Sequence, residues 1–141
     1  MNSTIEKFGY PGTLVHEFEQ WVVLLRPAQV TLGSLIVAAR SYATAFGDLQ
    51  PGAFAELGQA IAAIEKALAG FVGFERINYL MLMMVDPHVH FHVIPRYSGS
   101  REWEGRQFPD SGWPGVPDLK SAVQLGDAQI KNLTNKVQTC F

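Results

Sequence analysis

The chain has 141 residues, a length typical of one domain with a substantial buried core. Apolar residues make up 48% of it, charged residues make up 17%, and a net charge of −2 provides no general positive field for nucleic acid. No apolar stretch is long enough to cross a bilayer, no signal-peptide core opens the chain, and Cys140 has no second cysteine to pair with. We therefore expect a cytoplasmic protein that binds neither nucleic acid nor membrane.

The first half of the chain predicts a β-hairpin followed by a long helix. Residues 21–25 form a short β-rich run, and residues 34–39 form a second run that reads as its antiparallel partner. A helix is then predicted with Pro51 in its first turn and with Gly70 or Gly73 at its end. Apolar residues recur along it at helical spacing and predict its buried stripe: Phe54, Leu57, Ile61, Ile64, Leu68 and Phe71.

The second half predicts two more strands, an irregular segment and a short helix. Residues 77–85 read as a strand, and a further strand follows it directly. Residues 97–118 are rich in Gly, Pro, Ser and Trp and predict an irregular surface segment, whereas residues 127–137 predict a helix. The fold class is therefore α+β, with an antiparallel sheet of about four or five strands, one long helix and a short C-terminal helix. We expect one domain with a core over about 13–97 and an irregular tail over 98–141.

Three of the four histidines alternate with apolar residues in one short run: His88, His90 and His92. Successive side chains of a β-strand point to opposite faces, so the three imidazoles are predicted to share one face. Packing gives no reason for such a row, which suits either a metal or a negatively charged ligand. The other face is apolar and can be buried: Val89, Phe91 and Val93.

The run from His88 to Ile94 resembles the motif of the histidine triad family of nucleotide hydrolases and transferases, in which three histidines alternate with apolar residues. The order of the predicted elements is similar over roughly residues 21–96. The resemblance implies covalent nucleotidyl transfer, in which His90 attacks the α-phosphorus of a nucleotide and water then releases a nucleoside monophosphate. It also implies that His92 contacts the phosphate and that His88 orients His90 through a hydrogen bond. The implied substrates are dinucleoside polyphosphates or nucleoside phosphoramidates.

The chain departs from the family pattern at several positions. Ser34 stands where many relatives carry a fourth histidine, and we expect its hydroxyl to contact a phosphate oxygen. The segment that precedes the first histidine lacks the family's leaving-group hydroxyl, so Asp86 or a residue of the tail is expected to take that role. No acidic ribose-binding residue is found, and Arg26 and Gln29 are expected to face the nucleotide instead. Arg96 is expected to contact phosphate or to form a surface salt bridge.

Other functions remain open from the sequence. A nucleotidyltransferase or phosphorylase would use the same residues, and a binding module on this fold would turn over slowly. A zinc enzyme would take two of the histidines with Asp86 or Glu102, because three ligands along one strand span too far to meet one ion. His16 is expected at the surface, whereas Trp103 and Trp113 could cover an apolar patch, seal the nucleotide pocket or pack on a second subunit.

For the histidine triad interpretation we expect no metal ligand and no cofactor in the nucleophilic step. Mg²⁺ could accompany a polyphosphate substrate. The resemblance also implies a homodimer.

Overall fold

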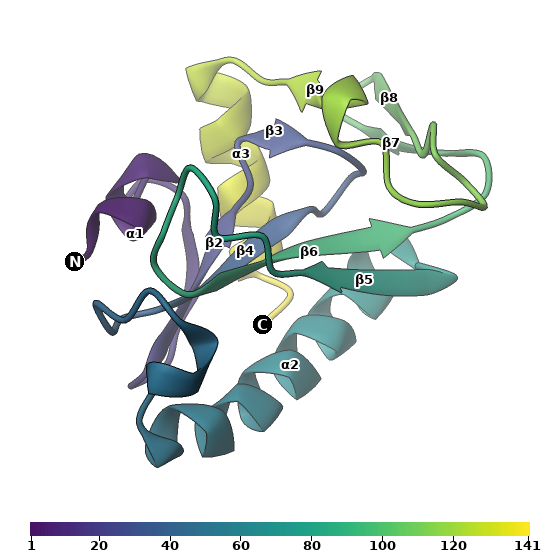
Figure 1. Ribbon diagram of the computed structural model, residues 1–141. Coiled ribbons are helices and arrows are strands. Elements are labelled where there is room, and N and C mark those ends of the chain that lie inside the picture. The colour runs from purple at the N-terminus through teal and green to yellow at the C-terminus, as the bar shows by residue number, and fades with distance from the viewer.

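The protein, described over residues 1–141 by a computed structural model, is built on one five-stranded antiparallel sheet (Figure 1). The strands lie in the order β1-β2-β4-β6-β5, and every neighbouring pair is antiparallel. The predicted α+β class is confirmed, and so is the predicted pairing of residues 21–25 with residues 34–39, of which residues 35–39 form the strand. The sheet strands are β1 (Leu14–Glu17), β2 (Trp21–Leu25), β4 (Leu35–Ala39), β5 (Arg76–Leu80) and β6 (His90–Arg96).

The remaining elements surround this sheet. Strand β3 pairs with β9, and β7 pairs with β8, so two small two-stranded sheets accompany the large one. No helix combines the length and the apolar character needed to cross a membrane. The elements are α1 (Ser3–Lys7), β3 (Ala28–Gln29), η1 (Phe46–Asp48), α2 (Pro51–Val72), β7 (Ser100–Trp103), β8 (Arg106–Pro109), η2 (Leu119–Ser121), β9 (Val123–Gln124) and α3 (Asp127–Gln138).

Helix α2 begins and ends where the sequence predicts, and much of the predicted stripe faces the core: Ile64 and Leu68 are buried, and Leu57 and Phe71 pack against it. Pro51 occupies the first turn, and Gly73 ends the helix in the left-handed conformation with φ 58°. Phe54, by contrast, is 41% exposed and packs against Phe46. Small alanines occupy much of the buried face, which lets the helix lie close to the sheet. The buried residues of the helix are Ala53, Ala60, Ile64, Ala67, Leu68 and Val72.

Both faces of the central strands are covered, which explains why β2 and β4 are apolar throughout. The main core lies on the face toward α2 and also takes in Phe108, Leu133 and Val137 from the part of the chain after residue 97. Figure 1 shows α1 on the opposite side of the sheet from α2. There a second cluster is formed by Ile5, Val22, Leu24, Ile36 and Ala38.

Two segments correct the sequence-based expectations. The strand predicted over 77–85 ends at Leu80, and residues 81–89 contain neither helix nor strand. Residues 97–118 were expected to be irregular, but they contain the β7–β8 hairpin. Glu104 and Gly105, with φ angles of 49° and 77°, form its tight turn, which suits the right-handed twist of the flanking strands. The predicted C-terminal helix is confirmed as α3.

Candidate active site

Strand β6 carries the second and third histidines of the motif on the face that α1 covers. His90 is paired with Ala38 and His92 with Ile36, and both partners belong to the small apolar cluster under α1. On the opposite face Val89 and Val93 are fully buried in the main core, so the predicted alternation of the strand is confirmed. His90 and His92 are themselves buried, and their ring centroids lie 5.1 Å apart.

The ring of His90 is fixed by a hydrogen bond to the backbone. Its Nδ1 lies 2.7 Å from the carbonyl oxygen of His88. A carbonyl can only accept, so Nδ1 must carry the proton and donate it. In the neutral imidazole the lone pair then belongs to Nε2. The expected orienting hydrogen bond from residue 88 therefore exists, but the main chain supplies it rather than the imidazole.

The imidazole of His88 is engaged elsewhere. His88 lies just before β6, and its Nδ1 is 3.1 Å from the hydroxyl oxygen of Thr4 in α1. Its backbone N–H donates to the same oxygen over 3.3 Å, and Tyr42 packs edge-on against its ring. All three imidazoles therefore lie on the side of α1, but only those of His90 and His92 line the cavity of the site, because the ring of His88 is bound to Thr4.

His92 is held in the opposite tautomer to His90. Its Nδ1 accepts a hydrogen bond from Nε of Arg26 over 3.3 Å, so the proton of the neutral ring must be on Nε2. Burial, and then the positive charges of Arg26 and His90, lower the pKa of His92 to about 4, although the Asp86 carboxylate opposes them. At neutral pH His92 is therefore an uncharged donor through Nε2, suited to a phosphoryl oxygen.

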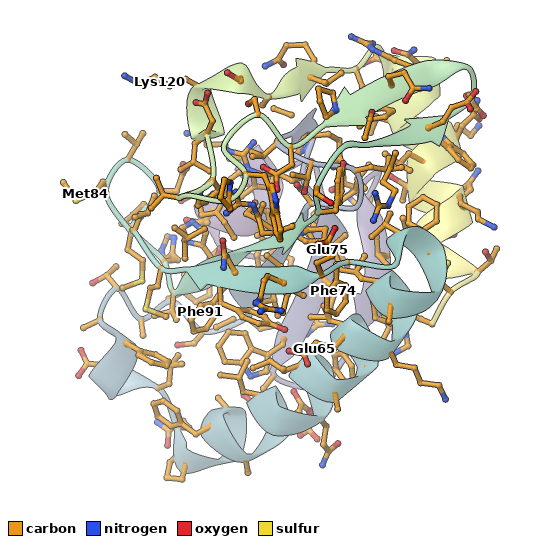
Figure 2. All side chains as sticks on the ribbon, turned by 90° about the vertical axis from the view of Figure 1, so that its right-hand side faces the viewer. Glu65, Phe74, Glu75, Met84, Phe91 and Lys120 are labelled. Carbon is orange, nitrogen blue, oxygen red and sulfur yellow. The ribbon has the colours of Figure 1, made fainter.

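A cavity of about 240 Å³ lies beside the two imidazoles and is lined by Leu82, Met83, Met84, Val85, Asp86, His90 and His92. Five of these residues belong to the irregular loop before β6. Asp86 in this loop is ion-paired with Lys7 of α1 at 2.6 Å. Met83 has a φ of 47°, which is uncommon for a residue with a side chain, and Figure 2 shows Met84 projecting outward from the loop. The loop thus closes the site on one side.

The N-terminal segment closes the site on the other side, and the sequence analysis missed it. The ring of Phe8 lies 5.6 Å from that of His90 and 5.9 Å from that of His92. Asn2 caps α1 through the N–H of Ile5 and donates to the carbonyl oxygen of Ala39, which ties the helix to the sheet. An Asn before a short helix is a recognised cap signal, but a five-residue helix has too few residues to show a periodic pattern.

Ser34 and Gln29 do not face the cavity, contrary to expectation. The hydroxyl of Ser34 is fully buried and donates to the carbonyl oxygen of Thr31 over 2.8 Å. The amide of Gln29 donates to the carbonyl oxygens of Arg26 and Ser34 and accepts from the N–H of Gly33. Both side chains satisfy the backbone of the turn between β2 and β4, because its polar groups are buried and need partners.

Arg96 forms a salt bridge, but in the interior and not at the surface as one of the two expectations had it. Its Nε and Nη2 donate to the two carboxylate oxygens of Asp110 over 2.7 and 3.1 Å, and its Nη1 donates to Asn78. The two charged side chains are only 4% and 1% exposed. Arg96 is therefore part of a buried ion pair that fixes the end of β6.

The other residues considered from the sequence have separate surroundings. Trp103 packs edge-on against Phe71 of α2, and Trp113 lines a different cavity beside β5. His16 stacks on Phe141. No group of three or more His, Cys, Asp or Glu side chains, Glu102 included, is arranged to hold a metal ion.

Solved structures share the whole architecture of this chain. A histidine triad protein from Sinorhizobium meliloti matches with a TM-score of 0.75 and 20% identity, over 100% of this chain and 96% of that one. One from Marinobacter aquaeolei matches with a TM-score of 0.73 and 21% identity, over 96% and 92% of the two chains. A third, from Bradyrhizobium japonicum, gives 0.69 and 17% identity over 99% and 95%. The chain has the histidine triad fold.

Comparison by sequence alone finds no family model and no curated protein that matches the chain. The histidine triad fold is therefore recognised through structure, over almost the full length of the chain and of its structural neighbours. His90 and His92 lie in the run in which histidines alternate with apolar residues, and this run resembles the motif of that family.

Proposed function

We propose that this chain is a histidine triad enzyme that releases a nucleoside monophosphate through a nucleotidyl intermediate on His90. The observation that carries the proposal is the hydrogen bond from Nδ1 of His90 to the carbonyl oxygen of His88. It leaves Nε2 as the basic nitrogen of a neutral imidazole, which is a competent nucleophile at pH 7. The shared fold and the motif around His90 support the same assignment.

The reaction divides into two displacements at phosphorus. Nε2 of His90 forms a bond to the α-phosphorus, and the bond to the leaving group breaks with its electron pair going to that group. Nε2–H of His92 donates a hydrogen bond to a non-bridging oxygen, where negative charge concentrates. Water then attacks the nucleotidyl-histidine, loses a proton, and returns His90 to its neutral form.

The ion pair at the cavity favours one of the two substrate classes. Asp86 is bound to the ammonium group of Lys7 at 2.6 Å and is therefore placed as an acceptor, not as a proton donor. A polyphosphate leaves as a stabilised anion, whereas the amine of a phosphoramidate needs a proton to leave. We therefore propose dinucleoside polyphosphates as the better substrates. The nucleophilic step requires no metal, and Mg²⁺ would enter with the polyphosphate.

The small cavity and the buried His90 favour a conformational change before a nucleotide binds. The cavity volume of about 240 Å³ lies below the roughly 300–1,000 Å³ of ordinary ligand pockets. His90 is only 1% exposed. We therefore propose that the loop over residues 81–87, or Phe8 beside the two imidazoles, moves to admit the substrate.

The proposal is tested by measuring AMP release from diadenosine tetraphosphate and from adenosine 5′-phosphoramidate with protein that has been treated with a chelator beforehand. His90→Ala is expected to lower turnover by more than about a thousandfold, because the nucleophile is lost. His16→Ala is the matched control, since this histidine stacks on Phe141 away from the site, and it should keep wild-type activity. Equal turnover in wild type and His90→Ala would contradict the proposal.

A second candidate is a nucleotide-binding module with little turnover, favoured by the small cavity and the buried His90. Binding of AMP without release from either substrate would point to it. A phosphorylase of the same fold is distinguished from a hydrolase by adding inorganic phosphate to the assay. A phosphorylase would then give ADP in place of AMP, because phosphate replaces water at the intermediate.

We also propose that the chain forms a homodimer through β5. This strand lies at the edge of the sheet, so the backbone groups of its outer side have no strand partner. The cavity that Trp113 lines adjoins the same strand. Sedimentation equilibrium is expected to give twice the mass of the chain, and a monomer at all concentrations would refute this arrangement.

A further inference from the structure

Arg26 follows β2 and is held beside the imidazole pair at several points. Its backbone N–H donates to the carbonyl oxygen of Ser34 over 3.0 Å, as the neighbouring strand β4 begins. Its Nη1 donates to the carbonyl oxygen of Ala28 over 2.6 Å, and its Nε donates to Nδ1 of His92 over 3.3 Å. The half-buried guanidinium is thus fixed in direction before any ligand binds.

The direction of the bond to His92 follows from the chemistry of the guanidinium. An arginine side chain has five N–H donors and no acceptor, and it stays charged at any ordinary pH. The nitrogen it faces must therefore be an acceptor, which leaves the proton of the neutral ring on Nε2. A His92 protonated on both nitrogens would lose this bond and would place two cations together.

The other groups around His92 do not impose this tautomer. The ring of His90 packs edge-on against it, and Phe8 of the N-terminal segment packs edge-on from another side. Asp86, paired with Lys7, is the one acidic group among those that act on the charge of His92, and it favours the charged ring. Arg26 is therefore the group that sets which nitrogen of His92 carries the proton.

We propose that Arg26 is a positioning residue for the nucleotidyl transfer, which holds His92 as the neutral Nε2–H tautomer so that this ring donates one hydrogen bond to the phosphoryl group. The proposal rests on the function proposed above for the site. Nη2 of Arg26 makes no hydrogen bond within the protein. It remains available to a second oxygen of the same phosphoryl group, which a planar guanidinium suits well.

A purely structural role for Arg26 makes different predictions. The bond to Ala28 would hold the turn between β2 and β4 whether or not His92 were present. Loss of that bond would lower stability without changing the tautomer or the pKa of His92. The protonation state of His92 therefore distinguishes the two roles.

The experiment follows the four imidazoles by long-range proton–nitrogen NMR over a pH titration, in the wild type and in Arg26→Met. His92→Asn assigns the His92 signals. Arg26→Lys keeps the charge and a donor, and it is expected to restore the wild-type pattern in part. Arg101→Met is the matched control, because the half-buried Arg101, like Arg26, donates to a backbone carbonyl, in its case from Nε to the carbonyl oxygen of Val72, and it has no bond to a histidine.

In the wild type His92 is expected to be in the Nε2–H form at pH 7. Arg26→Met is expected to mix the two tautomers and to raise the pKa of His92 toward 6.5 without reaching it, since burial is the larger cause of the lowered pKa. Turnover of diadenosine tetraphosphate at pH 7 should fall by roughly 10- to 100-fold, mainly in kcat, which is the size of effect known for groups that orient metal-bound imidazoles. The acid limb of the pH profile should shift to higher pH.

Two results overturn the proposal. One is a wild-type His92 that carries its proton on Nδ1. This result is measured on the wild type alone, so it is decisive even if Arg26→Met does not fold. The other is a folded Arg26→Met protein whose His92 keeps both its tautomer and its low pKa. These readouts do not depend on turnover. A wild type that releases no AMP would refute the proposed function, while the NMR result would still decide the role of Arg26.

Discussion

At its carboxyl end, strand β6 is fixed by a buried network, whereas at its amino end it emerges from an irregular loop. Arg96 binds both oxygens of Asp110, and the hydroxyl of Tyr97 bridges the N–H of Leu32 and the carbonyl oxygen of Phe108. The loop over residues 81–89 is instead tied to α1 by a partly exposed ion pair, and two of its apolar side chains are 83% exposed.

The difference teaches how a buried catalytic pair can be both rigid and accessible. His90 and His92 lie between the two ends, on a strand whose position the Arg96–Asp110 pair fixes. Segments with few buried contacts open at low free-energy cost, while buried networks open only with the whole domain. Access to the imidazoles is therefore expected through the amino-terminal loop and α1, with the strand itself unmoved.

The largest expected effect comes from Asp110→Ala, which removes the buried ion pair with Arg96 at the carboxyl end of β6. The guanidinium of Arg96 would then be buried without its partner, which typically costs about 3–5 kcal/mol. Urea unfolding followed by tryptophan fluorescence measures the loss. Asp118→Ala removes an exposed carboxylate that accepts from Lys120 and Ser121 in η2, and it serves as the control with a much smaller change. A loss for Asp110→Ala of less than about 1 kcal/mol would show that the end of β6 is held by other contacts.

A smaller effect is expected from acid. The pKa of His92 is lowered to about 4 from an ordinary value of 6.5, so the unfolded chain binds its proton first as the pH falls. Stability should therefore be lost between pH 6.5 and about 4, and it should not change through this group above pH 6.5. Urea midpoints at several pH values measure the slope. His92→Asn should flatten this part of it, and an unchanged slope in that variant would assign the acid sensitivity to other groups.

The smallest effect on stability is expected from Lys7→Met, which removes the ion pair between α1 and the loop before β6. An exposed ion pair contributes at most about 1 kcal/mol, and Lys7 is 54% exposed. The loop should nevertheless open more often, so modification of His90 by diethyl pyrocarbonate, read by mass spectrometry, should become faster. Lys66→Met on the exposed side of α2 is the control. Equal modification rates in the wild type and Lys7→Met would mean that this pair does not restrain the loop.

Sequence patterns predicted those parts of the molecule in which each residue's role depends on its near neighbours. The apolar runs of β2 and β4, the Pro51 and Gly73 boundaries of α2, and the alternation around His90 are of this kind. The β7–β8 hairpin was missed because its Gly- and Pro-rich surroundings hid two strands of four residues each.

The partners of polar side chains could not be predicted in the same way. Ser34 was expected at the phosphate because it stands where many relatives carry a fourth histidine, and Arg96 was expected either at the phosphate or in a surface salt bridge. Their actual partners, Thr31 and Asp110, are set by a turn and by a hairpin that form only in the folded chain. Arg26 was expected to face the nucleotide, but its bond to His92 joins two residues that are 66 positions apart in the chain and meet only in the folded sheet.

The carbonyl group that orients His90 has a consequence for how the site can change over generations. A side chain that orients a nucleophile can be lost by one substitution, whereas every residue that could replace His88 retains the main-chain carbonyl. Position 88 is therefore freer to vary than position 90, provided that the replacement leaves the local backbone path intact. Divergent descendants of this chain could lose the first histidine of the motif and still keep a working nucleophile.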